Sequence, residues 1–125
     1  MRGVLDNLVL QPLDRRPPDA GEIEVEVHAS GLNFRDVLNA LGVYPGEAGR
    51  PGSECAGVVT AIGEGVKTLQ VGDEVMALAD GAMASYVTTP ARRAVRKPAE
   101  LTFEQAAALP IAFLTAEYAL FDLAR

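Results

Sequence analysis

The most regular hydrophobic pattern in the chain is a strict alternation between residues 22 and 29. The apolar positions are Ile23, Val25, Val27 and Ala29, and the polar ones are Glu22, Glu24, Glu26 and His28. Successive side chains of a β-strand point to opposite faces of a sheet, so this period of two predicts a strand with one buried face. The polar row, His28 included, is then expected to face water.

The period changes to that of a helix between residues 33 and 41. Its apolar positions, spaced by three and four, are Phe34, Val37, Leu38 and Leu41. This spacing predicts a helix with one buried apolar face. Asn33 is a suitable N-cap, Asp36 lies near the positive end of the helix dipole, and Gly42 is expected to end the helix in a left-handed conformation.

Residues 43–52 are expected to form an irregular loop, because proline and glycine recur throughout the segment. A loop that follows directly on a rigid helix is a common place for a functional site. Tyr44 lies in this loop and is a candidate proton donor. Packing against its neighbours is the alternative interpretation of Tyr44.

The rest of the pattern predicts short strands followed by two helices. The expected strands are 4–10, 54–62, 74–78, 82–88 and 94–97, with a tight turn at Asp80-Gly81 between the third and fourth. Thr102 and Gln105 form a capping box for an Ala-rich helix that ends at Pro110, and residues 111–125 look helical. Strands of this number and length predict a mainly β fold with flanking helices, a small and partly open β-barrel.

Size, charge and cysteine content narrow the possible classes of protein. The chain has 125 residues, the usual size of one domain, and a net charge of −6, which argues against nucleic acid as a partner. Its single cysteine, Cys55, excludes an internal disulfide and fits a reducing compartment. Because there is neither a membrane-length apolar run nor a signal pattern, we expect a cytoplasmic protein that does not cross a membrane.

Common catalytic constellations are missing from the sequence. One cysteine and one histidine on separate elements cannot supply the three protein ligands of a catalytic zinc, so no metal site is predicted. His28 is predicted to face away from any nucleophile, which argues against a Ser–His–Asp triad. Gly63 and Gly65 lack the third glycine of a dinucleotide-binding loop and are interpreted as turn residues.

Several ordered motifs carry a resemblance to a known family. They are 33–38 (NFRDVL), 41–46 (LGVYPG), 52–59 (GSECAGVV), 71–75 (VGDEV), 101–107 (LTFEQAA) and 113–116 (FLTA). At this spacing the chain resembles, over nearly its whole length, the enoyl reductase domains of modular type I polyketide synthases. These domains belong to the zinc-free, quinone-oxidoreductase-like branch of the medium-chain dehydrogenase/reductase superfamily.

The resemblance implies a fold and a domain organisation. It implies that residues 1–110 form a GroES-like, substrate-binding lobe and that residues 111–125 begin the helix that links it to an NADPH-binding Rossmann lobe. The chain ends without a helix stop signal, so we expect it to lack that second lobe. The active site would then be the cleft between the two lobes.

The resemblance also implies a reaction and its partners. A hydride passes from NADPH to the β-carbon of an α,β-unsaturated thioester held on an acyl carrier protein, and a proton then reaches the α-carbon. The expected partners are this thioester, the Rossmann lobe and the other domains of the synthase. Two alternatives stay open: a GroES-like binding module without catalysis, and a quinone-oxidoreductase-like enzyme that reduces free enones.

The family's functional positions correspond to five residues of this chain. Tyr44 matches the proposed proton donor, and Asn33 and Thr115 match positions beside the nicotinamide. Asp36 and Glu54 match positions that contact the site residues without contacting substrate or cofactor themselves. Zinc-binding relatives have Cys where this chain has Asn33 and His where it has Ser53. Both differences remove metal ligands, in agreement with the predicted lack of a metal.

Overall fold

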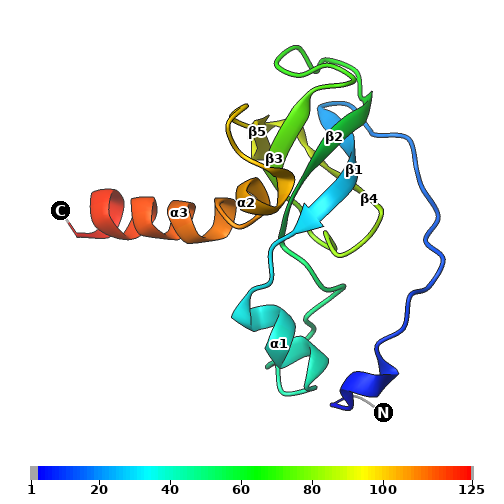
Figure 1. The fold of residues 1–125 in the computed structure, drawn as a ribbon, viewed down its shortest axis with the longest axis vertical. Coiled ribbons are helices and arrows are strands. Elements are labelled where there is room, and N and C mark those ends of the chain that lie inside the picture. Colours follow the sequence, from blue (N-terminus) through cyan, green and yellow to red (C-terminus); the bar gives the residue numbers. More distant parts are fainter. Residues whose placement is uncertain (1–2, 125) are drawn as a thin grey trace.

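The fold is built on an antiparallel sheet of five strands, shown in Figure 1 for the computed structural model, which describes residues 3–124. The strands are β1 (Glu22–Ser30), β2 (Glu54–Ile62), β3 (Glu74–Leu78), β4 (Tyr86–Pro90) and β5 (Ala94–Arg96). The helices are α1 (Phe34–Ala40), α2 (Phe103–Ala107) and α3 (Pro110–Glu117), and α3 continues into a π-helical stretch, Tyr118–Leu123. Short 3-10 turns occupy Leu5–Asn7 and Ala91–Arg93.

The sheet is curled but not closed. Its strand order is β4-β1-β2-β3-β5, so two strands separate β4 from β3. The Thr89 hydroxyl of β4 nevertheless donates a hydrogen bond to the Leu78 carbonyl at the end of β3, at 2.8 Å. This contact is possible only if the sheet bends back on itself, and it confirms the predicted partly open barrel.

The core lies inside this curl. Its fully buried side chains include Ile23 and Val25 of β1, Val59 of β2 and Val75 of β3, and Val27 packs against them, which confirms the first three positions of the buried face predicted for β1. Ala29, the fourth predicted position, packs instead against the second cluster, because the register of β1 shifts between Val27 and Ala29. A second, smaller cluster places Ala106 of α2 against the opposite side of β2. The first four residues of β2 are therefore buried on both faces of the sheet.

Two predicted strand assignments are wrong. Residues 4–10 form a 3-10 turn and an extended segment, and the backbone hydrogen bonds described there, from Asn7 to Val4 and from Leu8 to Leu5, are local. The turn at Asp80-Gly81 exists, but it does not join a hairpin, because β4 pairs with β1. Residues 79–83 instead bond to the 51–53 segment, for example Gly81 N to the Gly52 carbonyl at 2.9 Å, and this delays β4 until Tyr86.

Glu24 does not face water as its row in the alternation predicted. Its side chain is buried, with the residue 5% exposed, and accepts hydrogen bonds from Arg15 Nη2 at 2.7 Å and from the Thr60 hydroxyl at 2.8 Å. The face of β1 opposite the core is also covered at this position, by Arg15 from the preceding loop and by Thr60 of β2. His28 remains exposed as expected, with its ring centroid 4.4 Å from that of Phe103.

Replacing Glu24 by Gln is expected to lower the free energy of unfolding at pH 7 by about 1–2 kcal/mol. The hydrogen bond from Arg15 is the main cause that lowers the pKa of Glu24 in the folded state. A lowered pKa stabilises the fold above the unfolded-state value of about 4.3, and this stabilisation is lost as the pH falls through the folded-state value. Urea unfolding at pH 7 and pH 3 checks this, with the exposed Glu64→Gln as control; an equal deficit at both pH values contradicts it.

Candidate active site

Asp36 ties the start of α1 to the end of the loop that carries Tyr44. Its Oδ2 accepts a hydrogen bond from the backbone N–H of Asn33 at 3.0 Å, the carboxylate half of a capping box, and Asn33 is the N-cap residue, as predicted. Its Oδ1 accepts from the backbone N–H of Gly52 at 2.8 Å. The residue is only 6% exposed, so this carboxylate is a buried junction between two segments of backbone.

Glu54, the first residue of β2, joins two other segments in the same way. Its Oε1 accepts a hydrogen bond from Asn33 Nδ2 at 2.9 Å, and its Oε2 accepts from the backbone N–H of Ile111, in the first turn of α3, at 2.8 Å. The residue is 3% exposed, and a side chain on Gly31 would overlap its carboxylate. One buried carboxylate therefore fixes both the side chain of Asn33 and the start of α3.

Asn33 is held in one orientation but retains hydrogen-bonding capacity. The Nδ2 group of an asparagine carries two N–H donors, and the described hydrogen bonds use one of them, toward Glu54. The second donor is available to an acceptor on a ligand. Asn33 is partly exposed, so a ligand can reach it.

Thr115 lies on α3, one helical turn beyond Ile111, with an exposed side chain. Figure 1 shows α3 extending away from the sheet on one side while α1 lies beneath it. Within residues 3–124, no described contact joins Thr115 to Asn33 or Tyr44. The structure thus brings Asn33, Asp36 and Glu54 into direct contact, and it links Thr115 to them only through the anchored start of α3.

Tyr44 is placed by the C-terminal end of α1. Gly42 ends the helix with φ +71°, as predicted, and the backbone N–H groups of Val43 and Tyr44 both donate to the Leu38 carbonyl, at 3.0 and 3.2 Å. The Tyr44 ring is half-buried, and the Arg35 guanidinium carbon lies 5.6 Å from its centroid. Among the hydrogen bonds described for residues 3–124, none involves the Tyr44 hydroxyl, so the phenol is available to a substrate.

The polar side chains of α1 hold this loop, which sequence analysis did not foresee. Arg35 Nη2 donates to the Ala48 carbonyl at 2.7 Å, and Asn39 Nδ2 donates to the Gly49 carbonyl at 3.0 Å. Together with Asp36 they bind three points of residues 43–52. The available signal was their spacing, because positions 35 and 39 are one helical turn apart and therefore share a face.

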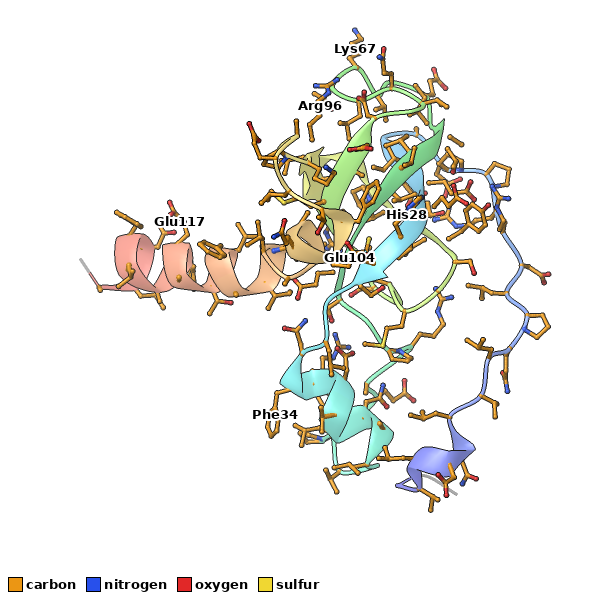
Figure 2. The ribbon with its side chains drawn as sticks, in the orientation of Figure 1. His28, Phe34, Lys67, Arg96, Glu104 and Glu117 are labelled. Atoms are coloured by element: carbon orange, nitrogen blue, oxygen red, sulfur yellow. The ribbon has the colours of Figure 1, made fainter. Side chains whose placement is uncertain are left out.

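The apolar side of α1 is not buried, contrary to its prediction. Phe34 is 74% exposed, and Figure 2 shows it projecting from α1 into open space, while Asp36 is the only buried residue of the helix. Val37 and Leu41 border an open cavity of about 770 Å³ beneath residues 3–10. The helical period was correct, but α1 is held by polar contacts to its loop instead of by packing on the sheet.

Within residues 3–124, no three His, Cys, Asp or Glu side chains lie close enough together to hold a metal ion. None of the helices in this range is both long and apolar enough to cross a bilayer.

Known proteins are similar to this chain in sequence and in fold. Residues 19–99 match the model of the alcohol dehydrogenase GroES-like domain, which is well over half of the chain. The chain belongs to this family. The chain is 49% identical to part of the pikromycin polyketide synthase component PikAII of Streptomyces venezuelae and 47% identical to part of the erythronolide synthase EryA2 of Saccharopolyspora erythraea, over 98% of its own length in each case.

The solved structures that are similar to this chain include reductases of the same kinds. The CurK enoyl reductase is 46% identical, with a TM-score of 0.87, over 94% of this chain and 39% of its own. The Escherichia coli quinone oxidoreductase complexed with NADPH is 35% identical, with a TM-score of 0.84, over 98% of this chain and 39% of its own. The domain is therefore related to polyketide synthase enoyl reductases and to NADPH-dependent quinone oxidoreductases. It spans about 3% of the two synthases and about two fifths of the solved reductases.

Proposed function

We propose that this GroES-like domain is the substrate-binding lobe of an NADPH-dependent enoyl reductase within a modular polyketide synthase. In this proposal it reduces the α,β-double bond of an acyl thioester carried by an acyl carrier protein. The observation that carries the proposal is the neutral, pre-oriented Asn33 amide held by buried Glu54, in a chain 46% identical to the CurK enoyl reductase. Residues 1–110 form the lobe, and residues 111–125 begin the connection to a Rossmann lobe.

The residues present fit a nicotinamide cofactor. When bound, NADPH supplies the hydride that adds to the β-carbon of the substrate. The second Nδ2 donor of Asn33 suits the carbonyl oxygen of a carboxamide, and the exposed Thr115 hydroxyl can donate or accept. Both groups are neutral, so they orient the carboxamide without changing the charge next to the reacting ring.

Tyr44 supplies the proton in this proposal. Addition of a hydride to the β-carbon leaves an enolate, whose α-carbon takes the Tyr44 hydroxyl proton. The O–H bond breaks, a C–H bond forms, and the resulting phenolate recovers a proton from water. What supports this role is a half-buried ring with a hydroxyl that no described hydrogen bond engages.

Asp36 and Glu54 act by holding other groups in place. Asp36 fixes the end of the 43–52 loop through Gly52, and Glu54 fixes the amide of Asn33 and the helix that carries Thr115. Neither carboxylate is accessible to a substrate, since both residues are more than nine-tenths buried. Their proposed contribution is the pre-orientation on which fast hydride transfer depends.

A second candidate function is the reduction of free enones or quinones. The similarity to the E. coli quinone oxidoreductase favours it, at 35% identity and with a TM-score of 0.84. Both functions use the same Asn33 and Thr115 positions. They differ in whether the substrate is attached to a carrier protein, so substrate choice separates them.

Replacing Tyr44 by Phe in the reductase that joins this lobe to its Rossmann lobe is expected to lower kcat about 100-fold or to scramble the configuration at the α-carbon. The KM for NADPH should stay the same, because the phenol is not assigned to the cofactor. The measurement is NADPH oxidation with an α-methyl enoyl thioester on a carrier protein, followed by chiral analysis of the product. Tyr86→Phe is the matched control, since that hydroxyl points to Glu26 on the sheet at 3.5 Å.

Each possible result separates the candidates. Turnover of the carrier-bound thioester, with little turnover of free enones or quinones, supports the proposed function. The reverse preference favours the second candidate, and absence of NADPH oxidation with every substrate overturns both. An unchanged rate and configuration in Tyr44→Phe removes Tyr44 as the sole proton donor.

A further inference from the structure

We propose that Arg35 is a positioning residue for Tyr44, which holds the ring and the loop and stabilises the phenolate left after proton transfer. The inference rests on the proposed role of Tyr44 as proton donor. It gives the first turn of α1 a part in the proposed reaction.

The contacts of Arg35 all lead to the Tyr44 loop. Its Nη2 donates to the Ala48 carbonyl at 2.7 Å, and its guanidinium carbon lies 5.6 Å from the centroid of the Tyr44 ring. A cation within about 6 Å of a ring centroid is attracted to the ring. One side chain therefore contacts both ends of the segment 44–48, and it does so from a helix that Asp36 fixes to Gly52.

The charge of Arg35 is not neutralised by a nearby carboxylate. Arg15, Arg16, Arg93 and Arg96 each pair with an Asp or Glu side chain, at distances from 2.7 to 3.6 Å. None of the ion pairs described within residues 3–124 includes Arg35. Its positive charge is thus left to act on the aromatic ring beside it.

The reaction changes the strength of this interaction. A neutral phenol attracts the guanidinium only through the ring quadrupole, whereas a phenolate carries a full negative charge spread over the oxygen and the ring. The interaction is therefore stronger after the proton has left Tyr44 than before, which is the condition for accelerating the step. Because Arg35 is exposed, water screens part of this effect, and we expect about a tenfold contribution to the rate.

The test uses Arg35→Met and Arg35→Lys in the reductase that contains this chain and its cofactor lobe, each made alone and in combination with Tyr44→Phe. Arg35→Met alone is expected to lower kcat about tenfold without changing the KM for NADPH, and Arg35→Lys to restore part of the loss. With Tyr44→Phe present, Arg35→Met should cause no further loss, because its effect passes through the phenol. Arg50→Met is the matched control, an arginine of the same loop with no described contact to Tyr44.

A second readout does not depend on activity. Amide hydrogen exchange of residues 43–49 should become faster in Arg35→Met, because the Ala48 carbonyl loses its donor, and should be unchanged in Arg50→Met. Unchanged exchange in Arg35→Met overturns the anchoring. If Arg35→Met does not fold, the neutral Arg35→Gln replaces it, and a wild-type kcat together with wild-type exchange in that variant overturns the inference.

The outcomes distinguish this inference from the proposed function. A tenfold loss that persists with Tyr44→Phe shows that Arg35 does not act through Tyr44, and leaves the reductase assignment intact. A Tyr44→Phe variant with wild-type rate and configuration removes Tyr44 as donor, and this inference with it. A loss seen only with Tyr44 present supports both.

Discussion

Replacing Gly57 by Ala is expected to prevent stable folding, with a loss of at least about 3 kcal/mol in the free energy of unfolding. Gly57 lies near the centre of β2, opposite Val27 on β1 and Val75 on β3. A Cβ atom there would overlap the backbone carbonyl of Glu26. A carbonyl in a paired strand cannot turn aside as a flexible side chain can, so β1 and β2 would have to separate.

The reactivity of Cys55 reports on this separation. Cys55 lies two residues before Gly57 on β2 and is 0% exposed, and burial raises the pKa of its thiol to about 12. A thiol reagent at pH 8 should therefore modify the wild-type chain only after denaturant is added, and Gly57→Ala without it. Gly65→Ala is the control, because that position has open space around it and only its φ of +82° is unfavourable. Protection of Cys55 in Gly57→Ala would contradict the prediction.

The parts of the fold that could be predicted from sequence are those set by local interactions. The limits of β2 and β3, the N-cap Asn33, the left-handed Gly42 and the capping box at Thr102 all match the structure. Each of these depends on residues within a few positions of one another. Hydrophobic periodicity and capping motifs also depend only on residues close together in the sequence, so they are sufficient to predict these features.

The errors arose where a distant segment decides the outcome. Glu24 is buried beneath Arg15, which comes from the loop before β1. Residues 79–83 bond to the 51–53 segment, and β4 pairs with β1 instead of β3. Nothing in the alternation of β1 or in the Asp80-Gly81 turn specifies those partners. Strand pairing depends on long-range contacts, and a short apolar run such as residues 4–10 forms a strand only where a neighbour is available.

The candidate site, too, could be predicted only in part. The family resemblance supplied Asn33, Asp36, Glu54, Tyr44 and Thr115 as positions, but not the contacts among them. Glu54 lies 21 residues after Asn33, so no local spacing predicts their hydrogen bond. The contacts from Arg35 and Asn39 to the loop were likewise visible only in the structure.

Replacing Glu54 by Ala is expected to lower the free energy of unfolding by about 3–4 kcal/mol. It is also expected to raise the KM of the proposed reductase for NADPH. Hydrogen bonds to a charged group contribute about 1.5–3 kcal/mol each, and the variant loses two. Asn33 Nδ2 and the backbone N–H of Ile111 then lack their acceptor. Both residues assigned to the nicotinamide are affected, because Asn33 loses its orientation and the helix that carries Thr115 loses its anchor.

Glu54→Gln separates the two effects. A glutamine keeps one acceptor oxygen but presents an N–H₂ group to one of the two donors, so we expect it to lose about 2 kcal/mol. Urea unfolding measures the stability of both variants, and the exposed Glu47→Ala is the matched control. A variant with full stability would show that the two hydrogen bonds contribute little to the fold.

The link from Glu54 to the cofactor is tested with Asn33→Ala. If Glu54 acts on NADPH by orienting Asn33, the KM for NADPH should rise in each single variant, and the double variant should show less than the product of the two effects. Independent, multiplicative effects would mean that Glu54 acts through α3 alone, by way of Ile111 and Thr115. A KM that stays at the wild-type value in Glu54→Gln, while stability falls, would limit this carboxylate to holding the fold together.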